Sequence, residues 1–253
     1  MGEIDRLSQI ETQWSVVRNA HQSDEEAARN AQRQLLQQYG TAIQRYLNAK
    51  LRDPAAADDV YQDFAVKFVQ GDFHKASPEI GRFRTFIRTI LFRQIADYYR
   101  AKKRRGNVQL DPEISPPQAD ETSRDEQFVE VWRDEMLKKA WDALHDVEVS
   151  SGKPWYSVLQ LRVRNPQMRS AELAKAVGEQ LDRSMTSANV RVLLHRAREK
   201  FSFLLIETIA NSLNSTSADE IESELADLKL LEYCQAALDQ FRKKEDQSSD
   251  SES

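Results

Sequence analysis

Apolar residues recur along this chain at intervals of three and four, which is the spacing of one face of an α-helix. The longest such stripe runs through residues 83–105, where a helical wheel of about 100° per residue gathers the apolar side chains on one side. They are Phe83, Phe86, Ile87, Ile90, Leu91 and Tyr98. Shorter stripes are Val60, Phe64 and Phe68; Leu173, Ala174 and Val177; Val190, Leu193, Leu194, Ala197 and Phe201; and Ile221, Leu225, Leu228 and Leu231. The pattern predicts a chain of amphipathic helices.

Capping residues mark the ends of several of these helices. Asp53 is an N-cap candidate, and it precedes Pro54, a residue type favoured at the first helical position. Gly178 is expected to end the helix that contains Leu173. Thr186 or Ser187 is expected to cap the helix that follows.

Composition favours the same fold class. The chain has 253 residues, enough for one large or two small cores, and it contains only 7 Gly and 7 Pro. Because turn-forming residues are so few, we predict an all-α fold with two helical domains. No apolar run approaches the roughly 20 residues that span a bilayer, and the opening MGEIDRLSQIETQW lacks a signal-peptide pattern. We therefore expect a cytoplasmic protein in which the single cysteine, Cys234, is a buried thiol.

Charge is strongly segregated along the chain. The formal net charge is −5, yet residues 106–135 carry nine acids against two arginines, and residues 217–253 carry eleven acids against four basic residues. Without these two segments, each of charge −7, the remainder has a charge of +9. Three prolines within residues 111–120 also indicate an extended linker. We predict helical domains at 1–105 and 128–212, an acidic linker at 106–127, and an acidic C-terminal helix with a disordered tail at 213–253.

The most basic segment coincides with the longest apolar stripe. Residues 82–105 contain nine Lys or Arg and a single acid, Asp97. The side of the wheel opposite the stripe carries Thr85, Arg88, Thr89, Phe92, Arg93, Tyr99 and Arg100. Exposed rings stack on unpaired bases for ~1–3 kcal/mol each, while arginines and the basic end from Lys102 attract phosphates. The alternative is that Phe92 and Tyr99 pack beneath a neighbouring helix and the arginines are only solvated.

The helix that begins at Pro54 has an acidic face beside its apolar stripe. This face carries Asp58, Asp59, Gln62 and Asp63. It suits a basic partner surface. The alternative is that the aspartates only complement the helix dipole near the N-terminus.

The order of these features resembles region 2 of bacterial sigma factors, especially the extracytoplasmic-function group. The matching stretches are Asp58-Asp-Val-Tyr-Gln-Asp-Phe64, Gly81-Arg-Phe-Arg-Thr-Phe86, Ile95-Ala-Asp97 and the basic end from Arg100 to Arg105, preceded by Thr12-Gln-Trp-Ser15, Gln38-Tyr39 and Arg45-Tyr-Leu47. The resemblance implies that one helix binds the clamp coiled coil of the largest subunit of core RNA polymerase. It implies that the next helix melts the minus-ten promoter element and binds its single strand.

The resemblance also assigns residues to these two roles. The implied core-binding residues are Asp58, Asp59, Gln62, Asp63 and Phe64. The implied minus-ten residues are Arg84, Phe86, Arg88, Phe92, Arg93, Tyr99, Arg100, Lys102, Lys103 and Arg104.

A second stretch resembles sigma region 4, which binds the minus-thirty-five element and the flap of the second polymerase subunit. The matching residues are Ser170-Ala-Glu-Leu-Ala-Lys-Ala-Val-Gly178 and Ser187-Ala-Asn-Val-Arg-Val-Leu-Leu-His-Arg-Ala-Arg-Glu-Lys-Phe201. On physical grounds they form a helix-turn-helix candidate, whose second helix would enter a major groove. The candidate minus-thirty-five residues are Ser187, Ala188, Arg191, His195, Arg196 and Arg198. The alternative is an ordinary amphipathic surface over 191–200.

The chain departs from the family pattern in three places. Eleven residues separate Gly178 from Val190, about twice the usual number, so the turn is expanded and the angle of the second helix is open. Phe86 stands where many relatives have tryptophan, and Arg93 where asparagine is common. Promoter preference is therefore expected to differ. The two resemblances together cover roughly residues 12–105 and 130–210.

The C-terminal segment matches neither resemblance. It predicts a helix from Ala218 to Phe241 followed by a disordered tail over 247–253. Either the helix caps the second domain, or this acidic extension folds back on a DNA-binding surface as an inhibitor. A separate anti-sigma factor is the other inhibitory partner that we consider.

The sequence favours a non-enzymatic role. It has no phosphate-binding Gly-rich loop and no nucleophile elbow, and His21, His74, His145 and His195 lack metal-ligand spacing. We therefore expect no cofactor and no metal, and we take His195 as a groove or phosphate contact. The sequence predicts an extracytoplasmic-function sigma factor that directs promoter recognition and melting by core polymerase. The alternative is a stand-alone helix-turn-helix transcriptional regulator.

Overall fold

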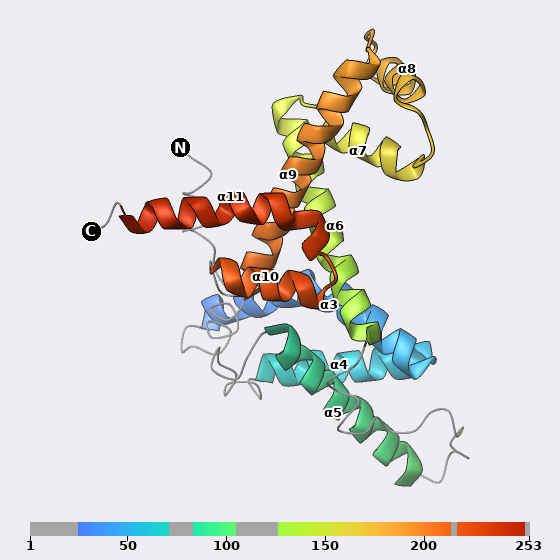
Figure 1. Cartoon of the computed structure of the whole chain (residues 1–253). Coiled ribbons are helices and arrows are strands. Elements are labelled where there is room, and N and C mark those ends of the chain that lie inside the picture. The colour runs from blue at the N-terminus through green and yellow to red at the C-terminus, as the bar shows by residue number, and fades with distance from the viewer. Residues whose placement is uncertain (1–24, 71–82, 105–125, 214–216, 251–253) are drawn as a thin grey trace. The chain divides into compact units, whose positions relative to one another are not determined.

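The computed structural model describes residues 25–70, 83–104, 126–213 and 217–250, and within these ranges every regular element is an α-helix (Figure 1). The helices are α3 (Glu25–Leu51), α4 (Pro54–Gln70), α5 (Phe83–Arg104), α6 (Glu126–Ser151), α7 (Trp155–Arg164), α8 (Ser170–Gln180), α9 (Ser187–Leu213), α10 (Ala218–Asp227) and α11 (Leu231–Asp250). The all-α prediction is confirmed for this part of the chain. The Thr12–Ser15 stretch and nearly all of the predicted linker lie outside the described residues.

The described residues form two compact units. The first contains α3, α4, α5, the start of α6 through Glu135 and the end of α9 from Ala210. The second contains the rest of α6 and α9 together with α7, α8, α10 and α11. The first unit thus includes residues beyond the 1–105 domain of the sequence analysis, because α6 brings a group of aromatic side chains to α3.

The turn between α3 and α4 is short and well capped. Arg52 has a φ of 51°, and its N–H donates to the Asn48 carbonyl at 3.0 Å, which ends α3 with a left-handed residue. The Asp53 carboxylate then accepts from the N–H groups of Ala55 and Ala56, at 3.1 and 3.3 Å. The predicted N-cap at Asp53 and helix start at Pro54 are both confirmed.

Aromatic side chains fasten the start of α6 to α3. The Tyr39 and Trp132 rings are stacked with centroids 4.9 Å apart, and the Tyr46 and Phe128 rings meet edge to face at 5.1 Å. The Arg45 guanidinium also forms an ion pair with Asp134 at 3.1 Å. Burial, together with the nearby charge of Glu135, raises the pKa of the Tyr39 phenol well above its usual value. The first ten residues of α6 are therefore part of the core of the first unit.

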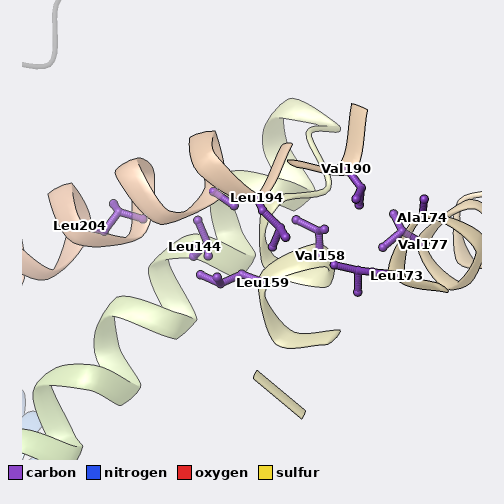
Figure 2. Close-up of a cluster of buried hydrophobic side chains, with 10 residues drawn as sticks. Leu144, Val158, Leu159, Leu173, Ala174, Val177, Val190, Leu194 and Leu204 are labelled. Carbon is purple, nitrogen blue, oxygen red and sulfur yellow. The ribbon is translucent and has the colours of Figure 1, made fainter. Parts of the chain in front are cut away.

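The core of the second unit lies where α6, α7, α8 and α9 meet. Figure 2 shows this cluster, to which each of the four helices contributes buried aliphatic side chains. Its members are Leu144, Val158, Leu159, Leu173, Ala174, Val177, Val190, Leu194, Ala197 and Leu204. The predicted inward residues of α8 and of the first half of α9 are confirmed, with Leu193 and Phe201 partly buried against the cluster.

The connection from α8 to α9 is built on a backbone motif that differs from the prediction. α8 continues past Gly178 to Gln180, and Asp182 takes the left-handed conformation with a φ of 49°. The Arg183 N–H donates back to the Gly178 carbonyl at 2.9 Å, as in a Schellman cap. A Cβ at Gly178 would lie 2.7 Å from the Arg183 carbonyl oxygen. Gly178 is therefore required for close backbone approach, and its prediction as the residue that ends the helix was wrong.

α9 begins where the capping residues predicted it. The Thr186 hydroxyl accepts from the Asn189 N–H at 3.1 Å, and Ser187 is the first helical residue. Of the two candidate caps, Thr186 fulfils the role.

The C-terminal segment forms two helices rather than the single predicted one. Lys229 has a φ of 58°, and the Leu230 N–H donates to the Leu225 carbonyl at 2.8 Å, which closes α10 with a second Schellman cap. Arg242 on α11 then forms ion pairs with Asp219, at 2.9 Å, and with Glu222 on α10. We call α10 and α11 the C-terminal hairpin. α11 reaches Asp250, so the prediction of a disordered tail from Gln247 was wrong for residues 247–250.

The buried side of the C-terminal hairpin is apolar. It consists of Ala218, Ile221, Leu225, Leu228, Leu230, Cys234, Ala237, Leu238 and Phe241, beside the buried Glu224. Burial raises the pKa of the Cys234 thiol to about 11, as expected for an inert core cysteine. Among the described helices, none is long and apolar enough to cross a membrane.

Candidate nucleic-acid interface

The helix α5 packs on α4 with a face that is rotated from the predicted one. Ile87, Ile90 and Leu91 are buried as expected, and Ile95 joins them. Phe86 and Tyr98, which the wheel placed in the core, are only half-buried. The buried arc is therefore centred nearer to Leu91 than to Phe83.

Two predicted minus-ten residues lie in this buried arc. Tyr99 is 6% exposed and Arg84 is also 6% exposed. Burial raises the pKa of the Tyr99 phenol, as do nearby Tyr98 and the carboxylate of Asp53 at the start of α4. The prediction that Tyr99 faces outward was wrong, because the stripe of Ile87, Leu91 and Ile95 turns this ring toward α4.

The exposed arc of α5 still combines rings with positive charge. Phe86 and Phe92 are half-buried, and Arg93 and Arg100 are exposed. Between the rings, the Thr89 hydroxyl donates to the Thr85 carbonyl at 2.8 Å. We call Phe86, Phe92, Arg93 and Arg100 the ring-and-guanidinium face. Rings beside positive charge are typical of surfaces that bind single-stranded nucleic acid. Here Phe86, rather than the buried Tyr99, is the second ring of the face.

The arginines of this part of α5 differ in their bonding. The Arg100 guanidinium forms an ion pair with Asp97 on its own helix. The Arg93 guanidinium has no hydrogen bond or ion pair with any described residue. Arg88 is half-buried and bonded, which places it at the edge of the exposed arc. Arg93 is thus the guanidinium that an incoming phosphate or base meets without breaking an existing ion pair.

The C-terminal turn of α5 is a second positive surface. Lys103 and Arg104 are exposed, and the Lys102 ammonium lies 5.8 Å from the centroid of the Tyr98 ring. Three cations in one turn also complement the negative end of the helix dipole. Together with the ring-and-guanidinium face, they extend positive charge along the helix.

The acidic face of α4 is exposed as predicted. Asp58, Asp59, Gln62 and Asp63 are all exposed, while Asp58 accepts from the Gln44 amide at 2.8 Å and Asp63 pairs with Lys67 at 2.6 Å. Asp59 has no such partner among the described residues. Val66 and Val69, which were not predicted as site residues, are exposed at the C-terminal end of the same face. We call these six residues the α4 face.

Phe64, also assigned to core binding, is not part of the α4 face. It is 2% exposed and stacks on Phe68 with ring centroids 6.1 Å apart. Its contribution is to hold α4 in the first unit, in agreement with the predicted inward stripe.

The first half of α9 presents a third polar surface. Ala188, Arg191, His195, Arg196 and Arg198 are exposed, and Ser187 is half-buried. The Arg191 Nε donates to the Ser187 carbonyl at 3.1 Å, and His195 Nε2 lies 3.5 Å from the Glu199 carboxylate. Val190 and Leu194 turn into the core on the other side (Figure 2). All six predicted residues therefore lie on the same side of one helix, which we call the α9 face.

Two further exposed residues on the same side of α9, not predicted from the sequence, are included in the α9 face. Val192 and Asn189 are exposed among the predicted residues. Val192 and Asn189 carry no charge, so a helical wheel does not show them as part of a basic surface. Only their position among arginines indicates that they belong to this face.

The C-terminal hairpin leaves the α9 face open. Ser202, beyond the last residue of that face, donates its hydroxyl proton to the Tyr233 carbonyl at 3.0 Å. Arg191, His195 and Arg198 remain exposed with the hairpin in place. No cluster of three or more His, Cys, Asp or Glu side chains in the described ranges is arranged to hold a metal ion.

Two of these surfaces lie within a span that matches a known protein family. Residues 35–105 match the family model described as sigma-70 region 2, a span that contains most of α3 and all of α4 and α5. A search of curated proteins and a search of solved structures found no match to the chain. The matched span includes both the α4 face and the ring-and-guanidinium face.

Proposed function

We propose that the chain is an RNA polymerase sigma factor of the sigma-70 family, of the extracytoplasmic-function type, and that it opens promoters. The match of residues 35–105 to the family model of sigma-70 region 2 supports this proposal. Its role lies in transcription initiation, through core polymerase and promoter DNA. The motifs Asp58–Phe64 and Gly81–Phe86, which resemble the extracytoplasmic-function group in particular, support this type. We also expect it to act in the cytoplasm, where promoter DNA and core polymerase meet.

The ring-and-guanidinium face of α5 is the observation that carries the proposal. Phe86 and Phe92 are half-buried rings on either side of the exposed Arg93. A core helix of a purely structural domain gains nothing from this arrangement, whereas unpaired bases stack on such rings for ~1–3 kcal/mol each. We propose that the minus-ten element binds here after its strands separate, and that Lys102, Lys103 and Arg104 hold the adjoining phosphates.

The α4 face supports docking on core polymerase. Asp58, Asp59 and Asp63 give it negative charge, and Val66 and Val69 add exposed apolar area at one end. In such an interface the buried apolar contacts supply most of the binding energy, while the charges steer encounter and fix register. We propose that its partner is the clamp coiled coil of the largest subunit.

The α8–α9 pair supports recognition of an upstream promoter element. It has the elements of a helix-turn-helix, with a capped second helix and a row of exposed arginines along it. We propose that this pair acts as sigma region 4, with the α9 face in a major groove at the minus-thirty-five element and the unit docked on the flap of the second subunit.

The exposure of the α9 face bears on regulation. Since Arg191, His195 and Arg198 are open while the C-terminal hairpin is packed, we propose that the hairpin stabilises the second unit. This exposure does not support the alternative in which the acidic extension folds back on a DNA-binding surface as an inhibitor. A separate anti-sigma factor would then be the partner to seek.

A transcription assay on supercoiled templates tests the proposed function. The full chain and core polymerase together should produce discrete transcripts, and thymines about ten base pairs upstream of each start should become reactive to permanganate. Neither component alone should do so. If the chain binds specific duplex sites without core polymerase, and adds no transcripts with it, the stand-alone regulator is the correct function.

A further inference from the structure

Val192 occupies an unusual position on the α9 face. Its side chain is 52% exposed, although the alternate residues Val190 and Leu194 of the same helix are buried in the core (Figure 2). A β-branched residue in an exposed helical position adds neither core packing nor helix propensity. Its structural contribution to the second unit is therefore small.

The neighbours of Val192 define a distinct surface. Ala188 lies one turn earlier on the same side of the helix and is also exposed. On a helical wheel of about 100° per residue, Arg191 and Arg196 flank this apolar pair on opposite sides. The middle of the α9 face is thus a short apolar strip between two cations.

The chemistry of duplex DNA offers one partner for such a strip. In the major groove the edges of the bases carry hydrogen-bond donors and acceptors, and the C5-methyl group of thymine is the apolar feature. Residues in the first turns of the second helix of a helix-turn-helix are those that meet base edges. Ala188 and Val192 lie in the first two turns of α9, which begins at Ser187.

The flanking residues are suited to hold the strip in place. Arg191 is oriented by the bond from its Nε to the Ser187 carbonyl, at 3.1 Å. Arginines on both sides of the strip can bind guanine edges or phosphates. Glu199, about two turns beyond Val192, is exposed on the same side of the helix, and its negative charge disfavours a phosphate there.

We propose that Val192, with Ala188, determines base preference by contacting the methyl group of a thymine in the upstream promoter element. This inference rests on the proposed placement of the α9 face in a major groove. It assigns a specificity-determining role to an apolar residue, whereas the charged residues supply affinity and register.

Substitution of thymine by deoxyuracil tests the contact, because it removes only the methyl group. The full chain, alone and bound to core polymerase, is first used to select its upstream element from random duplex DNA. Each thymine of the selected element is then replaced singly, and binding is measured by competition. We expect one or two positions at which deoxyuracil lowers affinity about three- to fivefold, the effect of losing one buried methyl group.

The Val192→Ala variant links the effect to this residue. It should bind the thymine duplex as weakly as the wild type binds the deoxyuracil duplex, and it should no longer distinguish the two. Val163→Ala on α7 is the matched control, since Val163 is 61% exposed and outside the α9 face. It should retain the full preference for thymine.

Three outcomes separate the possibilities. If no position depends on the methyl group, or if Val192→Ala keeps the full thymine preference, the proposed contact is wrong. If transcripts form normally in either of these cases, the sigma-factor function still stands. If the chain selects duplex DNA but gives no transcripts with core polymerase, the proposed function fails while the thymine contact remains measurable.

Discussion

The phenol ring of Tyr39 on α3 lies parallel to the indole ring of Trp132 on α6, with 3° between their planes and 4.9 Å between their centroids. Both residues are buried; Tyr39 lies within the span that matches sigma-70 region 2, residues 35–105, and Trp132 lies beyond its end. The unit that contains the matched span is therefore completed by residues that follow that span in the chain.

Trp132→Ala should lower the free energy of unfolding of the full chain by about 3–5 kcal/mol, the usual cost of emptying a buried aromatic site. Denaturant unfolding followed by far-ultraviolet circular dichroism measures this loss. Tyr233→Ala, which truncates an exposed ring, is the matched control and should change little. A loss below about 1 kcal/mol for Trp132→Ala would mean that α6 does not stabilise the first unit.

Phe92→Ala combined with Arg93→Ala should impair promoter opening, because it removes one stacking ring and the guanidinium that has no partner among the described residues. We expect open-complex formation to fall by about tenfold or more, measured by permanganate reactivity, with core binding unchanged. Lys103→Ala with Arg104→Ala is the comparison. It should weaken DNA binding in a salt-dependent way, without a specific defect in strand separation.

Tyr99→Ala tests whether the Tyr99 ring is buried or faces outward from α5. Since Tyr99 is buried, its loss should reduce the thermal stability of the chain. A fully stable Tyr99→Ala protein with a selective opening defect would favour the outward orientation of this ring instead.

Asp59→Lys with Asp63→Lys should weaken association with core polymerase by about tenfold or more, because like charges would then face each other across the interface. The stability cost is small, since the exposed pair of Asp63 with Lys67 contributes only about 0–1 kcal/mol. Fluorescence anisotropy with labelled chain measures the affinity.

A matched double variant lies on α6. Asp142→Lys with Asp146→Lys reverses two exposed charges at the same spacing, and Asp142 likewise pairs with a lysine, Lys138, at 3.0 Å. It should bind core polymerase normally. Equal loss in both double variants would indicate a general charge effect rather than docking through the α4 face.

Gly178→Ala should destabilise the chain by about 1–3 kcal/mol, because the added methyl group meets the Arg183 carbonyl oxygen at 2.7 Å and the turn must move. Alanine's better helix propensity, worth up to about 1 kcal/mol, offsets part of this cost. Asp182→Gly in the same turn should stabilise instead, since the φ of 49° suits glycine. Thermal unfolding of the two variants shows whether they shift in opposite directions.

Most of the helical framework follows from local sequence. The Asp53 and Thr186 caps and the buried stripes of α4, α8 and α9 were predicted, because each depends on neighbours within one or two turns. The region 2 resemblance was predicted in the same way, from motifs that lie on α4 and α5. The residue roles within that resemblance stay predictions.

Features that depend on distant contacts were not predictable in the same way. Tyr99 and Phe92 are alike on a wheel of α5 alone, and only the packing of α5 on α4 decides which is buried. Trp132 packs on Tyr39, which lies far from it in the sequence, so no local sequence pattern predicts this contact. Lys229 and Asp182 adopt left-handed conformations although neither is glycine. Because such caps are predicted from glycine, neither cap could be predicted from the residue type.

The single cysteine gives the chain an internal reporter. Cys234 is sealed in the C-terminal hairpin with its thiol protonated at neutral pH, so alkylating reagents can modify it only when the hairpin opens. The mass added by alkylation can therefore time that opening in the wild-type protein, in isolation and during a round of transcription, with no engineered dye.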